Sequence, residues 1–213
     1  MKRILCVLIA LLMCLALTGC RREDPLKDMP NPIATITMAD GKVMRFELQY
    51  WTATNTVLNF IKLANDGFYD GLQFHRIVPG VLIQGGCPLN KGTGNAGYTI
   101  KGEFEANGIE NPISHSRGVI SMARLEDNNS ASSQFFILQG NYPEYDGQYA
   151  AFGYAMDEET LANIDLIAAQ PVDGYYSPLR TQKIQTVRVN VHGYEEHLKD
   201  PITIPLPKEK DDK

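Results

Sequence analysis

The sequence lacks several features that define large classes of protein. It has no excess of positive charge, since Lys+Arg 20 stand against Asp+Glu 25, for a formal net charge of −5 over 213 residues. Without a basic stripe to neutralise phosphates, nucleic acid is not an expected partner. There is no internal repeat, and no apolar run reaches the roughly 20 residues that a spanning helix needs. A hydrophobic content of 44% still predicts a globular chain rather than a disordered, collagen-like or coiled-coil one.

The common motifs of metal-dependent and covalent catalysis are also missing. The 4 histidines have no metal-ligand spacing, and no CxxC, HExxH or GxSxG pattern occurs. Residues Gly92–Gly97 match GxGxxG, but the following Tyr98–Ile100 is extended in character rather than helical, so we interpret these glycines as a loop. We therefore expect no metal and no cofactor.

The first twenty residues are typical of an export signal. A basic start, Met1–Arg3, precedes an apolar run, Ile4–Leu17, whose 14 residues are too few to span a bilayer comfortably. The run ends in Leu-Thr-Gly-Cys20, which resembles the bacterial lipobox, where cleavage exposes a cysteine that receives lipid. We predict residues 1–19 to be a lipoprotein signal peptide and Cys20 to be lipidated. An ordinary secretory signal with an incidental cysteine is the alternative.

Removal of the signal changes the charge and the cysteine content. Two basic residues leave with it, so 20 basic residues become 18 and the net charge of −5 becomes −7. Of the 4 cysteines, two leave with the signal and Cys20 is consumed, so Cys87 is expected to remain as a lone buried thiol. Two or three acyl chains would anchor the protein stably. We predict a cell-envelope location, with the domain outside the cytoplasm and the lipid in a bacterial membrane.

The rest of the chain divides into a tether, one domain and a tail. Residues 20–32 are charged and contain proline without periodicity, which predicts a flexible tether. Residues 33–194 are expected to form a single monomeric domain. The Pro- and Lys-containing tail, residues 195–213, is expected to be loosely ordered.

Hydrophobic periodicity predicts short strands and two helices. The predicted elements are a hairpin of 33–38 and 43–48 around Asp40-Gly41, a helix capped by Thr54 or Asn55 and stopped at Gly67, strands near 72–78, 82–84, 119–123, 134–138 and 151–156, a second helix opened by Asp157–Glu159, and a last strand with Val187, Val189 and Val191 inward. This order favours an all-β fold, a closed antiparallel barrel with a helix over each end.

Three segments carry a resemblance to a known family. They are Gly67–Gly71 with Phe74–Gly86 (FHRIVPGVLIQGG), His115–Arg124 (HSRGVISMAR) and Ser133–Ile137 (SQFFI). In this order they resemble the signature segments of the cyclophilin family of peptidyl-prolyl isomerases, over about residues 33–194. The resemblance implies a closed eight-stranded antiparallel barrel capped by two α-helices, and proline-containing polypeptides as partners.

The resemblance also implies a set of site residues. Those expected to act in catalysis are Arg76 and Gln84, and those expected to bind substrate are Phe136, Leu82, Val81, Gln134, Ala123, Arg124, Tyr145 and Tyr149. His75 is assigned to structure. The chain departs from the family at its pocket, with Val81-Leu82 for Phe and Met, Glu144-Tyr145 for Trp-Leu, Tyr149 for His and Arg124 for Asn. Cyclosporin binding in the family depends partly on that Trp, and such departures resemble bacterial members.

The chemistry of the X-Pro bond explains why an arginine suits this task. Resonance gives the bond a rotation barrier of about 18–20 kcal/mol, and no bond has to break for it to turn. A donor near the prolyl nitrogen helps because the nitrogen lone pair becomes available only as the amide twists. We therefore expect an isomerase that acts on exported proteins as they fold. A chaperone or assembly module that binds proline segments, with incidental catalysis, is the alternative, and a purely structural envelope protein is a weaker one.

Overall fold

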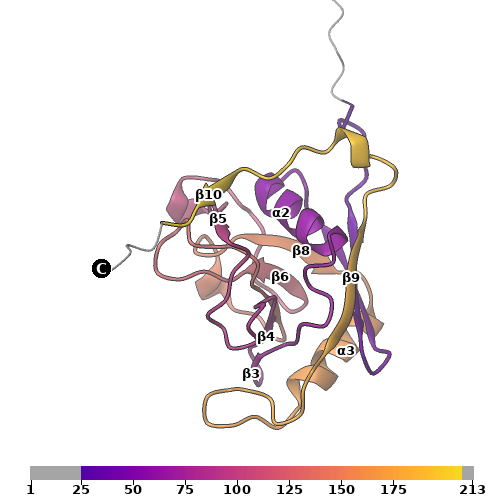
Figure 1. Cartoon of the computed structure of the whole chain (residues 1–213), viewed down its shortest axis with the longest axis vertical. Helices are drawn as coiled ribbons and strands as arrows, with labels where there is room; N and C mark the ends of the chain where they lie inside the picture. The colour runs from indigo at the N-terminus through magenta and orange to yellow at the C-terminus, as the bar shows by residue number, and fades with distance from the viewer. Residues whose placement is uncertain (1–24, 208–213) are drawn as a thin grey trace, which may run out of the picture.

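The protein, seen here in a computed structural model, is described for residues 25–207. Its strands are β1 (Ile33–Met38), β2 (Val43–Leu48), β3 (Arg76–Val78), β4 (Leu82–Gly85), β5 (Tyr98–Ile100), β6 (Val119–Met122), β7 (Phe135–Leu138), β8 (Ala151–Ala155), β9 (Ile184–Asn190) and β10 (Thr203–Pro205). Its α-helices are α2 (Thr54–Asn65) and α3 (Glu158–Ala168), and short 3-10 turns lie at Glu105–Asn107, Pro143–Tyr145 and Glu195–His197. Eight strands form one antiparallel sheet and β10 pairs separately with β5 (Figure 1).

The eight-stranded sheet is curled but open, so the predicted closure of the barrel is wrong. Its order is β3-β4-β7-β6-β8-β2-β1-β9, and within the described residues no ladder joins the two edge strands. Residues 71–77 approach residues 176–184 through single contacts only, such as an isolated bridge between Gln73 and Lys183 and a 2.8 Å bond from Ile77 N to Tyr176 O. The approach is irregular because the second segment is a loop for most of its length.

The amino-terminal hairpin forms as the sequence predicts. β1 pairs with β2 from Ile33↔Glu47 to Thr37↔Val43. Its turn includes Gly41, whose φ of 91° lies in the left-handed region that glycine enters without steric cost. The alternation is confirmed too, since every second side chain of each strand is buried.

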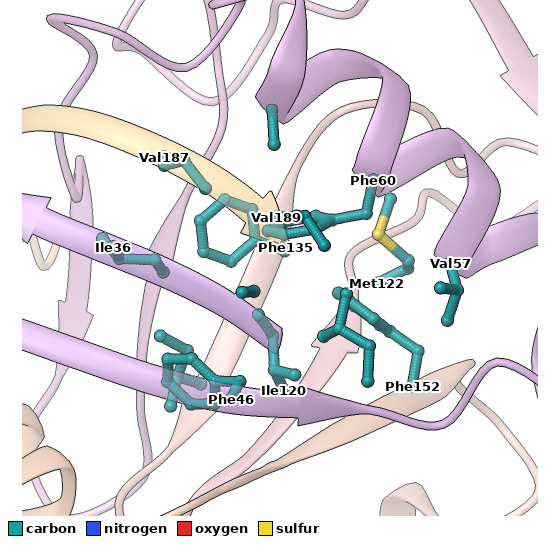
Figure 2. Close-up of a cluster of buried hydrophobic side chains, with 14 of the residues drawn as sticks. Ile36, Phe46, Val57, Phe60, Ile120, Met122, Phe135, Phe152, Val187 and Val189 are labelled. Atoms are coloured by element: carbon teal, nitrogen blue, oxygen red, sulfur yellow. The ribbon is translucent and has the colours of Figure 1, made fainter. Parts of the chain in front are cut away.

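The main core lies inside the curl of the sheet, and α2 covers one end of it. Phe60 of α2 packs against the rings of Tyr69, Phe135 and Phe152, with centroids 5.3, 5.4 and 5.2 Å away. Figure 2 shows Phe60 pointing from the helix into side chains contributed by several strands. Buried aromatic rings in such contacts contribute area and about 0.5–1.5 kcal/mol per pair beyond it.

The cap of α2 differs from the prediction. Its N-cap residue is Ala53, not Thr54 or Asn55, and no side chain of the helix caps it. Instead Glu103, far along the chain, accepts hydrogen bonds from the N–H groups of Asn55 (3.0 Å) and Thr56 (2.7 Å). A carboxylate at this position also interacts favourably with the helix dipole.

The second helix follows the predicted pattern. Asp157 is its N-cap and accepts a 2.8 Å hydrogen bond from Thr160 N. Ile164, Ile167 and Ala168 are buried against the sheet. The last strand of the sheet is also confirmed, with Val187, Val189 and Val191 buried.

Both ends of the described chain pack on the domain more closely than predicted. Leu26 and Met29, in the predicted tether, are buried in the main core because they are apolar residues within an otherwise charged segment. In the predicted loose tail, residues 203–205 pair with β5. Cys87, the only cysteine within residues 25–207, is buried as expected. Cys20 and the signal peptide lie outside the described residues. No helix between residues 25 and 207 is long and apolar enough to cross a membrane.

Candidate active site

The site is built where strand β7 presents its two faces to two different environments. Phe135 points into the main core, whereas Phe136 belongs to a second apolar cluster on the other side. Neighbouring residues of a strand face opposite sides of the sheet, so Phe135 packs in the main core and Phe136 packs in the second cluster. Strand β4 adds Leu82 to the same cluster as Phe136.

A row of polar side chains runs beside this apolar cluster. Arg76 and Gln84 are directly opposite one another in the β3–β4 pair, and Arg76 Nη1 donates to Gln84 Oε1 at 3.2 Å. Gln84 Nε2 then donates to Gln134 Oε1 at 3.0 Å. Gln134 Nε2 donates in turn to the carbonyl oxygens of Gly92 (2.8 Å) and Gly94 (2.9 Å). The loop carbonyls thus fix the orientation of both amides and, through them, of the guanidinium.

Most N–H donors of the Arg76 guanidinium have no partner among the described residues. A guanidinium has five N–H donors, and among the described residues Arg76 uses one of them, toward Gln84. The group is half-buried, and its Cζ lies 5.9 Å from the ring centre of Tyr176. It is therefore a fixed positive charge with donors left over at the edge of an apolar surface.

Half-buried side chains, several of them aromatic, pack around this apolar cluster, which we call the cup. The half-buried residues packed on it include four that the sequence assigns to substrate binding: Val81, Ala123, Tyr145 and Tyr149. The rings of Tyr145 and Tyr149 meet the Phe136 ring edge-on, at 6.0 and 5.5 Å between centroids. Rigid aromatic and aliphatic walls of this kind suit a small apolar ring.

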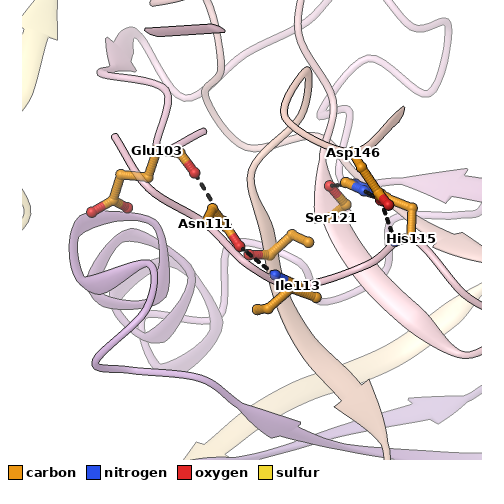
Figure 3. A network of polar contacts seen from close by, with 7 residues as sticks. Glu103, Asn111, Ile113, His115, Ser121 and Asp146 are labelled. Atoms are coloured by element: carbon orange, nitrogen blue, oxygen red, sulfur yellow. Dashed lines mark hydrogen bonds and ion pairs between the residues drawn. The ribbon is translucent and has the colours of Figure 1, made fainter. Parts of the chain in front are cut away.

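His115 packs its ring against Phe136 of the cup. Its ring lies nearly parallel to Phe136, with centroids 6.3 Å apart. Nδ1 is 3.0 Å from Asp146 Oδ1 and Nε2 is 3.0 Å from Ser121 Oγ, as Figure 3 shows. Burial lowers the pKa of His115 below its usual 6.5, although Asp146 acts in the opposite direction. In the neutral ring, Nδ1 donates to the carboxylate and Nε2 accepts from the hydroxyl.

Arg124, assigned to substrate binding by the sequence, holds the rim together. Its Nε donates to the carbonyl of Gln148 (3.0 Å), and its Nη1 donates to the carbonyls of Leu125 (2.9 Å) and Glu126 (3.1 Å). Its guanidinium also lies 4.9 Å from the ring centre of Tyr149. These contacts join the loop after β6 to the aromatic wall.

The close packing around the site explains one of the glycines in the QGG segment. Gly86 has a φ of +82°, and a Cβ there would lie 2.3 Å from the carbonyl oxygen of Ser133. That carbonyl directly precedes Gln134, and Ser133 Oγ donates to the carbonyl of Gly86 at 2.8 Å. Only glycine permits the two segments to approach so closely.

Sequence reasoning missed several contributors to the site. Tyr176 lies beside Arg76 although it comes from an irregular loop, and the carbonyls of Gly92 and Gly94 act through their backbone. Neither has a side-chain signal that could have revealed it. The role of His115 beneath Phe136 was also missed, although its place in the HSRG segment was noted. Within residues 25–207, no group of three or more His, Cys, Asp or Glu is placed to hold a metal ion.

A curled antiparallel sheet with two helices and a guanidinium beside an apolar cup is the architecture of the cyclophilin fold. A crystal structure of a cyclophilin-type peptidyl-prolyl cis-trans isomerase from Cryptosporidium parvum, in the presence of the dipeptide Ala-Pro, superposes with a TM-score of 0.65 at 28% identity, covering 74% of this chain and 98% of that one. The cyclophilin AquaCyp293 from Hirschia baltica shares the fold with a TM-score of 0.58 at 21% identity, covering 75% of this chain and 73% of that one.

Sequence comparison makes the assignment more specific. The family model described as cyclophilin type peptidyl-prolyl cis-trans isomerase/CLD matches residues 33–189. Peptidyl-prolyl cis-trans isomerase B of Bacillus subtilis is 43% identical over 141 residues, 64% of this chain and 95% of the relative. A peptidyl-prolyl cis-trans isomerase of Helicobacter pylori is 42% identical over 134 residues, 63% of this chain and 78% of the relative.

The chain therefore belongs to the cyclophilin-type peptidyl-prolyl cis-trans isomerase family. The family and the relatives named for this activity support the same activity for this chain.

Proposed function

We propose that this protein accelerates rotation about X-Pro bonds in exported proteins as they fold, with Arg76 as the catalytic residue. The observation that carries the proposal is the row Arg76–Gln84–Gln134 beside the cup floored by Phe136. A prolyl ring seated in the cup would bring its nitrogen next to the guanidinium. The Cryptosporidium parvum structure in the presence of the dipeptide Ala-Pro supports proline-containing substrates.

The proposed mechanism needs only positioning and electrostatics. As the X-Pro bond twists, conjugation is lost and the prolyl nitrogen gains a lone pair that can accept a hydrogen bond from Arg76. Because this bond is stronger in the twisted state than in either planar one, it lowers the barrier. A decrease of about 7 kcal/mol corresponds to roughly five decades in rate. Gln84 holds the guanidinium in place, and no proton has to be transferred.

The proposal predicts the behaviour of an Arg76→Ala variant. Its kcat/KM on an Ala-Pro peptide should fall by about two decades or more, because one fixed charged donor is lost at the rotating bond. Arg45→Ala is the matched control, since Arg45 is an exposed arginine that pairs with Asp157 and Glu159 away from the cup. Equal activity in both variants and the wild type would refute the role of Arg76. Loss of turnover with intact rescue of client folding would favour the chaperone alternative.

We also propose that the protein is a lipoprotein of the bacterial cell envelope, anchored through Cys20. The sequence pattern of residues 1–20 supports this, and these residues lie outside those that the structure describes. An anchored isomerase would meet unfolded chains as they emerge from the membrane, where slow proline steps limit folding. Membrane partition of a Cys20→Ala variant tests the anchor. That the domain acts as a monomer stays a prediction.

A further inference from the structure

A pocket of about 440 Å³ opens beside the amide pair of the proposed site. Gln84, Gln134 and Ala123 line it, and the first two of these also belong to the row that positions Arg76. A peptide with its proline in the cup would thus place a neighbouring residue at this pocket. The pocket is also lined by Thr99 of β5 and by Leu206.

Leu206 comes from a segment that lies after the last strand of the large sheet. We call residues 198–207 the C-terminal strap. In Figure 1 the strap follows the short helical turn after β9 and crosses the α2 side of the molecule to β10, which lies beside β5. The family match ends at residue 189, so the strap adds a pocket wall from outside the matched region.

The strap is attached to the domain at several points along its length. Leu198 packs against the main core. Asn55 of α2 clamps the backbone of Ile202, since its Oδ1 accepts from Ile202 N at 2.6 Å and its Nδ2 donates to Ile202 O at 3.0 Å. Two reciprocal hydrogen bonds fix both the position and the direction of the chain at this residue.

Strand pairing then sets the position of Leu206. Ile204 is opposite Thr99 and Pro205 is opposite Tyr98 in the β10–β5 pair. Strand β5 is itself fixed on its other side, where Ile100 N donates to Ala131 O at 2.8 Å. Pro205 has no N–H to donate, which suits the end of an edge strand. Because the register of β10 on β5 is fixed, Leu206 has a defined position in the pocket wall.

We propose that the C-terminal strap is a specificity element and that Leu206 limits which side chain can lie next to the proline-binding cup. This inference rests on the proposed function, since it concerns peptides bound at the same site. The pocket lining also includes Arg124, so a charged side chain is not excluded, and Leu206 selects among side chains by the volume that it occupies. The volume that Leu206 occupies favours small or medium side chains over large ones.

Peptide binding tests the strap independently of catalysis. The probes are peptides with one Ala-Pro core that carry Ala, Leu or Trp before it, and their Kd values are measured by NMR titration of the purified protein, strap included. Leu206→Ala should improve Trp-peptide binding relative to the Ala peptide by about fivefold, because it widens the pocket. Leu206→Trp should weaken binding of the Leu and Trp peptides by a similar factor.

Ile202→Ala is the matched control, since Ile202 lies on the same strap with 78% of its surface exposed and does not line the pocket. It should leave all Kd ratios at their wild-type values. The proposal is overturned if both Leu206 variants rank the peptides as the wild type does, or if Ile202→Ala changes the ranking equally. If the wild type binds the peptides but does not isomerise them, the proposed function is refuted. The Kd ratios would still test the role of the strap.

Discussion

At the scale of single residues, the site depends on side chains whose orientation is fixed by the backbone behind them. The carbonyls of Gly92 and Gly94 orient Gln134, which orients Gln84, which holds Arg76. Resemblance predicted the three side chains in this row because each stands in a recognisable segment. It could not predict the carbonyls, because any residue carries one. The row explains how a long, flexible arginine becomes a positioned donor.

The two histidines next to this row predict how stability depends on pH. Burial is the largest cause that lowers the pKa values of His75 and His115 below 6.5 in the folded state. The unfolded chain then takes up protons first as the pH falls, so the free energy of unfolding is at its full value above about pH 6.5 and decreases as the pH falls through the lowered values. Urea unfolding at pH 7.5, 6.5 and 5.5 should show this loss.

A variant separates this effect from other titrations. His115→Gln should have a weaker pH dependence over this interval than the wild type. Asp40, Asp70 and Asp157 have lowered pKa values because they accept hydrogen bonds, from Lys42, Arg188 and Thr160 respectively, and they act only near and below 3.8. A pH-independent wild type between 7.5 and 5.5 would contradict the account of the buried histidines.

At the scale of elements, the sequence predicts correctly those elements whose determinants lie within a few neighbouring residues. The β1–β2 hairpin and helix α3 were predicted because alternation, a turn glycine and an N-cap aspartate act over a few residues. The sequence analysis wrongly predicted a closed barrel, because closure depends on how a loop near residue 180 meets the segment before β3. The strand β10 was missed since its Pro-rich sequence has no strand periodicity.

The cap of α2 gives a prediction at this scale. Glu103→Ala removes the acceptor for two N–H groups at the start of the helix, at a position that is almost fully buried. The free energy of unfolding should decrease by about 1–2 kcal/mol, as measured for lost caps. Urea denaturation measures it, with exposed Glu110→Ala as the control that should change stability by less than about 0.5 kcal/mol. Equal stability of the two variants would show that Glu103 does not cap α2.

At the scale of the whole molecule, the first residue that packs in the main core lies close in sequence to the proposed anchor, Cys20. Leu26, which is buried, follows Cys20 by six positions, and an extended chain of six steps spans about 20 Å at most. An anchored domain would thus be held near the membrane surface. The predicted tether is shorter than its sequence suggested, because burial of Leu26 and Met29 could not be inferred from a charged, Pro-containing segment.

The anchor is tested by fractionation of cells that express the full chain. The wild type should sediment with membranes and incorporate labelled palmitate. Cys20→Ala should do neither, because acyl chains supply the membrane affinity. Cys87→Ala is the matched control and should remain membrane-bound, since that thiol is buried in the domain. Wild-type protein found in the soluble fraction would refute the anchor.

The measurement closest to the central claim is the rate of cis–trans interconversion of an Ala-Pro peptide on the protein, by NMR exchange under conditions that saturate the site. Arg76→Ala should still bind the peptide, because the cup of Phe136 and Leu82 is unchanged. Its bound-state interconversion should be slower than that of the wild type by about two decades or more, because the donor to the twisted prolyl nitrogen is gone. An Arg76→Ala variant that interconverts bound peptide at the wild-type rate would contradict the account.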